Sequence, residues 1–173
     1  MSLNGGTFRA AGVPDISVPT SLGVSGGTFD TAGYSGVISG NISGSGSLRK
    51  VGAGTLTLSG TKTYIGPTQI EAGQVVVTGS ALSQTSSVSL AAGTTLNVSA
   101  VGGLHLSTGK TLTGVGNIVG NVTAGAGAVV IPQGQIQPLA QVVAIQAEDL
   151  SLGSDWAVFD NSQHGTGAGG SYN

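Results

Sequence analysis

Short stretches in which aliphatic and polar residues alternate recur along the chain, and glycine bounds each of them. The clearest are Thr55–Leu58, Gln74–Val77, Thr95–Val98, Thr111–Thr113 and Asp149–Leu152. Alternation with a period of two residues is typical of a strand that is buried on one face. Helical periodicity is nearly absent: the apolar positions of residues 139–147 fit a short helix, but Val143-Ala144-Ile145 fits a strand equally well, and we favour the strand. The pattern predicts an all-β protein.

The alternating stretches belong to longer repeats. Gly5-Gly6-Thr7-Phe8 returns later in the chain as Gly26-Gly27-Thr28-Phe29. The first inward-facing residue of each later repeat is expected, at irregular spacing, at Leu56, Val75, Leu96, Leu112, Val129 and Leu150. Repeats of this length, each with two or three short strands and glycine-rich turns, predict a parallel β-helix, a solenoid with rungs of roughly 16–21 residues. An ordinary β-sandwich with coincidental spacing is the alternative.

A single rung cannot fold alone. Ordering about 20 residues costs roughly 20–40 kcal/mol of backbone entropy, whereas four or five buried aliphatic side chains return about 6–15 kcal/mol. The partners of each rung are therefore the adjacent rungs of the same or a neighbouring chain. Open strands at either end also favour end-to-end assembly with another copy.

Composition and charge exclude several classes of protein. Only 7% of the 173 residues are charged, the net charge is −2, and there is no cysteine. A nucleic-acid binder needs a basic stripe, and a disulfide framework or a cysteine metal site needs cysteine. No apolar run has the length of a membrane span, and Met1–Asn4 lacks the features of a secretory signal. The tag-like start and the glycine-rich finish suggest that residues 1–173 are a single β-helix segment of a longer protein.

One stretch is specific enough to identify a family. Residues 44–79 contain Leu48-Arg49-Lys50-Val51-Gly52-Ala53-Gly54-Thr55-Leu56-Thr57-Leu58-Ser59-Gly60, then Tyr64-Ile65-Gly66, then Thr68-Gln69-Ile70-Glu71-Ala72-Gly73-Gln74-Val75-Val76-Val77. In order and spacing these residues closely resemble the autotransporter-associated β-strand repeat. The positions that carry the resemblance are Lys50, Gly52, Gly54, Thr55, Leu56, Leu58, Gly60, Tyr64, Gly66, Thr68, Ile70, Gly73, Val75 and Val77. The departures, Thr61-Lys62-Thr63 in place of asparagine, Pro67 for glycine and Val75 for leucine, lie in turns or are conservative.

The resemblance extends more weakly to both sides. Residues 26–30 and 35–40 are similar to the preceding rung, residues 112–122 to the following one, and 149–152, 158–160 and Tyr172 to later strands, whereas residues 133–141 depart most. The resemblance implies a right-handed parallel β-helix of the passenger type, from a bacterial surface or secreted protein. It also implies an extracellular or cell-surface location and a scaffold or stalk role.

Catalysis by paired carboxylates is not supported by the positions of the acids. The seven acidic residues are Asp15, Asp30, Glu71, Glu148, Asp149, Asp155 and Asp160. Glu148 and Asp149 would point to opposite faces of a strand, and Asp30 and Glu71 are expected about two rungs apart. We therefore predict that these carboxylates are solvated strand ends and turns, not a catalytic acid pair.

Other possible sites have simpler structural interpretations. His105 is expected to point outward between Leu104 and Leu106, and His164 lies near Asp160 and Ser162 without the spatial assembly that a triad needs. The glycines of residues 114–120 are interpreted as rung turns because no helix follows them. The sequons at Asn41, Asn97 and Asn121 are interpreted as strand and turn residues. Outward threonines form no regular array of the kind used to bind ice.

The sequence therefore predicts a non-catalytic structural or adhesive β-helical module: a rigid stalk, passenger or filament segment with no cofactor, metal or nucleic acid. A β-helical carbohydrate-binding or carbohydrate-active domain, whose site would be built from outward Thr, Asn and Gln, is the alternative. In that case the partner would be a surface glycan. A fibre of protomers stacked through their open rungs is a third hypothesis.

Overall fold

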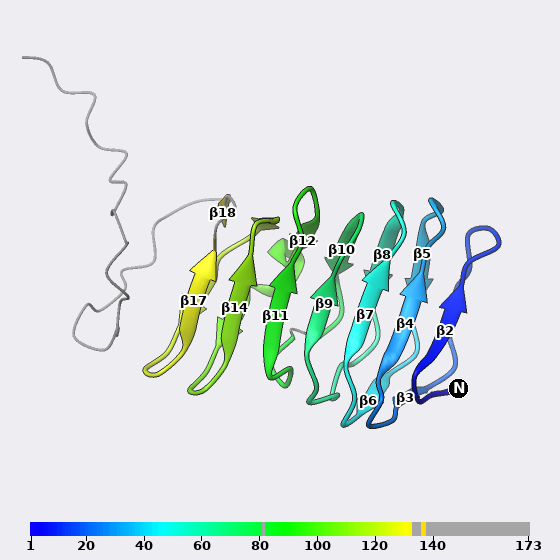
Figure 1. Cartoon of the computed structure of the whole chain (residues 1–173), viewed down its shortest axis with the longest axis horizontal. Coiled ribbons are helices and arrows are strands. Elements are labelled where there is room, and N and C mark those ends of the chain that lie inside the picture. The colour runs from blue at the N-terminus through cyan, green and yellow to red at the C-terminus, as the bar shows by residue number, and fades with distance from the viewer. Residues whose placement is uncertain (81, 133–135, 138–173) are drawn as a thin grey trace, which may run out of the picture.

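The computed structural model describes residues 1–80, 82–132 and 136–137, and in this part the chain is a parallel β-solenoid of about six turns. Every strand pair is parallel and joins one rung to the next, so that the strands stack along the long axis of the molecule (Figure 1). No α-helix occurs among the described residues, where the helical structure is a single 3₁₀ turn, η1 (Ser99–Val101). The predicted parallel β-helix is confirmed.

One side of the solenoid is a seven-stranded sheet. In spatial order its strands are β17 (Val129–Pro132), β14 (Thr111–Gly114), β11 (Ser87–Leu90), β9 (Thr68–Ile70), β7 (Leu48–Val51), β4 (Gly27–Asp30) and β2 (Gly6–Arg9). The repeat seen in the sequence is part of this ladder, because Gly6, Thr7 and Phe8 lie directly beside Gly27, Thr28 and Phe29.

A second side is a six-stranded sheet. Its strands are β18 (Ile136–Gln137), β15 (Asn117–Val119), β12 (Thr95–Asn97), β10 (Gln74–Val77), β8 (Thr55–Leu58) and β5 (Gly36–Ile38). The alternating stretches 55–58, 74–77 and 95–98 thus form three successive strands of one sheet, as their pattern predicted.

The third side is less regular. It contains a three-stranded sheet of β1 (Ser2–Leu3), β3 (Thr20–Leu22) and β6 (Ile42–Gly44), and a two-stranded sheet of β13 (Leu104–Leu106) and β16 (Val122–Ala124). A single bridge between Ile42 and Lys62 continues the first of these sheets into the next rung.

The predicted repeat positions are partly wrong. The predicted step from Leu96 to Leu112 joined two different sheets: Leu96 stacks on Ile118, whereas Leu112 belongs to the opposite sheet. The next predicted step, from Leu112 to Val129, is wrong by one residue, because Leu112 pairs with Val130. Val129 faces outward and is 46% exposed. Leu150 and the predicted strands at 143–145 and 149–152 lie outside the described residues.

Rung length varies along the described part of the solenoid. The longest step between paired strand residues runs from Ser87 to Thr111, and the step from Thr111 to Val129 is among the shortest. The long step contains the 3₁₀ turn η1, which has no counterpart in the rungs before it within the described residues.

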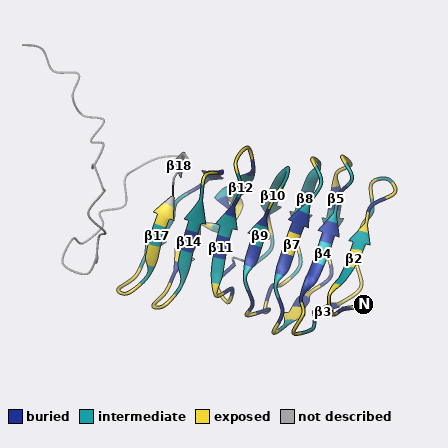
Figure 2. Ribbon diagram, viewed as in Figure 1, coloured by how far each residue is buried: buried dark blue, intermediate teal, exposed yellow. Residues whose placement is uncertain are grey.

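The core is a set of aliphatic columns that run through the rungs. One column stacks Leu56, Val75, Leu96 and Ile118, each 4% exposed or less. Figure 2 shows the burial of the central strands and the exposure of β17 at one end. Burial alternates strictly along β8 and β10, so the period-two pattern of the sequence is the pattern of side chains pointing in and out.

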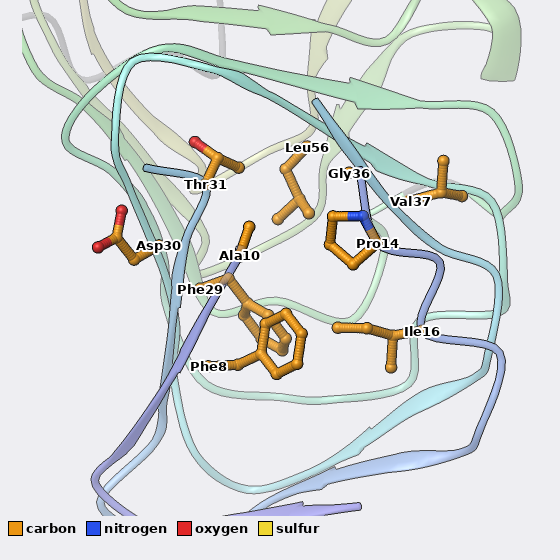
Figure 3. A pocket seen from close by; sticks show the side chains of 10 residues that line it. All are labelled: Phe8, Ala10, Pro14, Ile16, Phe29, Asp30, Thr31, Gly36, Val37 and Leu56. Atoms are coloured by element: carbon orange, nitrogen blue, oxygen red, sulfur yellow. The ribbon is translucent and has the colours of Figure 1, made fainter. Parts of the chain in front are cut away.

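A small gap lies near the first rung, where Gly36 occupies the position that Leu56 fills one rung later. The gap has a volume of about 10 Å³ and is lined mainly by apolar side chains, including the tilted rings of Phe8 and Phe29 and the ring of Pro14 (Figure 3). A space of this size holds about one water molecule. It is a packing defect and not a ligand pocket.

Candidate functional site

The residues that carry the sequence repeat come together on two successive rungs, formed by β7 and β8 and by β9 and β10. Among them Lys50 is the most unusual, because its side chain points into the interior and is 0% exposed. Its Nζ donates to Thr31 Oγ1 at 3.0 Å and to the carbonyl oxygens of Val51, Gly52 and Ala72 at 2.9, 2.7 and 3.0 Å. The ammonium therefore binds oxygens from three successive rungs.

Burial changes the protonation of this lysine. Removal from water disfavours the charged form and lowers the pKa of Lys50 to about 8, while the charge of Asp30 opposes that shift. The oxygens within hydrogen-bond distance of the ammonium are uncharged. Lys50 is thus a buried cation held by backbone and hydroxyl dipoles, an arrangement suited to structure and not to proton transfer with a substrate.

A second lysine is buried on the third side of the solenoid. Lys62 is 3% exposed, and its Nζ donates to the carbonyl oxygen of Leu58 at 2.7 Å and to that of Ser80 at 3.4 Å. Its backbone N–H also donates to Ser80 Oγ at 2.8 Å. Desolvation lowers the pKa of Lys62 to about 8.

Three buried hydroxyls form a hydrogen-bonded chain. Tyr64 Oη and Thr68 Oγ1 are 2.6 Å apart, and Thr68 Oγ1 lies 3.0 Å from Thr85 Oγ1. Thr85 Oγ1 reaches the carbonyl oxygens of Gly66 at 2.7 Å and Ser87 at 3.0 Å, so the chain ends on the backbone. Burial raises the pKa of Tyr64 to about 12, which keeps the phenol protonated.

The repeat's aliphatic positions fill the interior. Leu56 and Leu58 stack on Val75 and Val77, and Ile70 lies in register with Lys50; these aliphatic side chains are 4% exposed or less. Thr55 faces outward, where its Oγ1 donates to Gln74 Oε1 at 3.3 Å.

The repeat's glycines lie where backbones of neighbouring rungs touch. A Cβ on Gly54 would lie 1.7 Å from the carbonyl oxygen of Tyr34, and Gly52 has a φ of +80°, which a side chain would strain. Gly60, Gly66 and Gly73 make the same kind of close backbone contact. The spacing of these glycines is therefore set by the stacking of turns.

The carboxylates do not assemble into a catalytic cluster in the part of the chain that the structure describes. Asp30 lies beside Val51 and Glu71 is one rung further, which confirms their predicted separation. Each forms an ion pair, with Arg9 and Arg49 respectively. Asp15 accepts a hydrogen bond from Ser39 Oγ at 2.7 Å. The other four acids lie outside the described residues.

The remaining sequence candidates serve the backbone or face solvent. His105 points outward, as predicted, beside the Thr123 hydroxyl. Asn41 Oδ1 and Asn97 Oδ1 accept hydrogen bonds from backbone N–H groups at Thr61 and Ser99. Within residues 1–80, 82–132 and 136–137, no three His, Cys, Asp or Glu side chains are grouped to hold a metal ion. His164 lies outside this range.

Further residues at the site had no assigned role in the sequence. Every second residue from Lys62 to Ile70 is buried, so the Lys62 side chain points into the interior. This alternation is the sequence signal that could have identified Lys62 as a buried lysine. For Thr85 the sequence holds no comparable signal.

Residues 48–77 match the family model of the passenger-associated-transport-repeat. The chain carries this repeat. The match lies within the predicted range 44–79 and confirms the recognition made from the sequence. No curated protein and no solved structure matched the chain.

The passenger-associated-transport-repeat coincides with the two rungs that contain the lysines and the start of the hydroxyl chain. The repeat and the solenoid around it support a passenger-type β-helical module. The repeat is a structural one. None of the described residues belongs to a helix with the length and apolarity of a membrane span.

Proposed function

We propose that this chain is a non-catalytic structural or adhesive segment of a bacterial surface or secreted protein, exposed outside the cell. The observation that carries the proposal is that the buried polar side chains bind other parts of the solenoid. In the described residues, every buried side-chain nitrogen and oxygen has a hydrogen-bond partner. The Lys50 ammonium and the Thr85 hydroxyl are bound to oxygens of neighbouring rungs.

The charged side chains of one face and the packing of the interior support the same proposal. Two exposed charged side chains of neighbouring rungs, Arg49 in β7 and Glu71 directly after β9, are bound to each other. The gap beside Gly36 has room for about one water molecule. The inward-facing repeat residues hold the rungs together in a stack. In the proposed role, this stack of rungs lengthens the protein that contains it.

A polysaccharide panel tests the absence of catalysis. The purified chain is incubated with neutral and acidic polysaccharides, and cleavage is followed by the release of reducing ends. We expect none above a heat-denatured control. Cleavage that depends on the folded chain would contradict the proposal and support the carbohydrate-active alternative.

A carbohydrate-binding role is the second candidate, favoured by one surface feature. The outward positions Thr55, Gln74, Thr95 and Asn117 form an uncharged polar column on the six-stranded sheet. Binding on a glycan array that is lost in Gln74→Ala, with Gln69→Ala on the opposite sheet as the matched control, would establish this role. Silence across the array would remove it.

A further inference from the structure

The aliphatic interior of the solenoid leaves the register between neighbouring rungs ambiguous. Leu56 and Leu58 stack on Val75 and Val77. A slip of two residues keeps every side chain on its own face, and it would place Leu56 on Val77, again one aliphatic residue on another. Burial of apolar surface is non-directional, so it distinguishes poorly between these two registers.

Lys50 responds differently to such a slip. Its ammonium binds Thr31 in the preceding rung, Val51 and Gly52 in its own rung and Ala72 in the following rung, all within 3.0 Å. A slip of two residues moves the carbonyl of Ala72 by about 7 Å along the strand direction. The ammonium, which is 0% exposed, would then lose a partner without gaining water.

We propose that the buried Lys50 ammonium is a register lock, which fixes how the rungs that contain Thr31, Lys50 and Ala72 stack on one another. A single buried polar group is known to specify register at the expense of stability in other repetitive structures. The lysine occupies an interior position whose neighbour in the next rung is the aliphatic Ile70.

The competing explanation assigns the register to the glycines. A Cβ at the position of Gly73 would approach the carbonyl oxygens of Gly54 and Gly52 to 2.4 and 2.6 Å. A slip would bring other residues with side chains into this tight contact. The two explanations separate when Lys50 is replaced and the glycines are kept.

Disulfide trapping measures the register directly, because the chain has no cysteine of its own. Thr57 and Val76 are paired on adjacent strands and face outward, so a Thr57→Cys/Val76→Cys pair reports the native register. A Thr57→Cys/Thr78→Cys pair reports a slip of two residues, because in the native register these Cα atoms are about 8 Å apart, beyond disulfide range. With Lys50 present, we expect only the first pair to cross-link under equilibrium oxidation.

The decisive variant is Lys50→Met, which keeps a long side chain and removes the charge. We expect the yield of the slipped cross-link to rise at least about tenfold, because the slipped register becomes more populated. The yield of the native cross-link should fall by a matching amount. Leu112→Ala, a core truncation in β14, is the control for general loosening and should leave both yields unchanged. Thr31→Val, which removes one of the four acceptors, should give a smaller rise and decides the matter if Lys50→Met does not fold. Slipped yields that stay at the Lys50 level in the folded variants would overturn the proposal and assign the register to the glycines.

Discussion

Two lysines lie inside the described part of this solenoid without a carboxylate among the hydrogen-bond partners of either ammonium. Lys50 and Lys62 are both at most 3% exposed and both donate to oxygens of neighbouring strands and turns. A buried charge of this kind is costly. These lysines therefore hold the strands and turns that they bind in place, and their buried charge lowers the stability of the fold. The pH dependence of the free energy of unfolding should reveal that cost.

Stability should rise with pH between pH 8 and 10. The folded lysines lose their protons near their pKa of about 8, whereas in the unfolded chain they stay protonated up to a pKa of about 10.5. In this window the unfolded state binds more protons, so the free energy of unfolding increases with pH, by up to about 2 kcal/mol per lysine. Urea denaturation across the window measures it.

The matched variant for this experiment is Lys50→Met, which should show a flatter dependence on pH than the native chain. Tyr64, whose pKa is raised to about 12, opposes the effect only above its unfolded value near 10. A free energy of unfolding that falls between pH 8 and 10 would contradict this account of the lysines.

Glycine at position 54 is required by a close approach of two backbones. Because a Cβ there would lie 1.7 Å from the carbonyl oxygen of Tyr34, Gly54→Ala forces two rungs apart. We expect a loss of about 3 kcal/mol or more in the free energy of unfolding, a size typical of severe core disruption. Gly12→Ala is the control, since nothing lies within 4 Å of its added Cβ. Equal stability of the two variants would show that the turns are not tightly stacked.

At the scale of the element, alternation predicts a strand but not the sheet to which the strand belongs. Residues 95–97 (Thr-Leu-Asn) and 111–113 (Thr-Leu-Thr) both place a leucine between two polar residues, yet β12 and β14 lie on different sides of the solenoid. The predicted step from Leu96 to Leu112 failed for this reason. The 3₁₀ turn η1 between these strands lengthens the rung, and such an insertion does not change the two-residue alternation of the strands on either side.

For the candidate site, the sequence identifies the residues of the repeat but not the partners that they bind. The repeat motif includes Lys50, Tyr64 and Thr68, and all three lie within the matched residues 48–77. What the motif could not provide is the partner of each polar group. Thr31 and Thr85 lie on rungs outside the motif, and their contacts depend on how the rungs stack.

The aliphatic columns should carry most of the stability of each strand. Leu96 in β12 is 0% exposed and stacks between Val75 and Ile118. We expect Leu96→Ala to lower the free energy of unfolding by about 2–5 kcal/mol, from lost burial and the cavity that remains. Thr95→Ala, at the adjacent outward position, should cost less than about 1 kcal/mol. Similar losses for both would show that β12 does not face the interior as described.

At the scale of the whole molecule, the rung is the unit of construction. Neighbouring rungs are joined by the same parallel pairing along both large sheets. The passenger-associated-transport-repeat occupies rungs at the centre of the stack, with further rungs on both sides of it in the described residues. In such a solenoid each rung contacts only its neighbours. Each rung should therefore add its own contribution to the free energy of unfolding, and a rung should fit beside another copy of itself.

Duplication of one rung tests this central claim most directly. Leu48 and Thr68 are paired, so residues 48–67 make one full rung, and a second copy inserted after Pro67 should stack in register. The measurement is urea denaturation of this variant, beside a control that duplicates only residues 48–57. The account predicts a folded β protein with a free energy of unfolding no lower than that of the original chain and a larger m-value, because more surface is buried. A full-rung variant as destabilised as the half-rung control would contradict it.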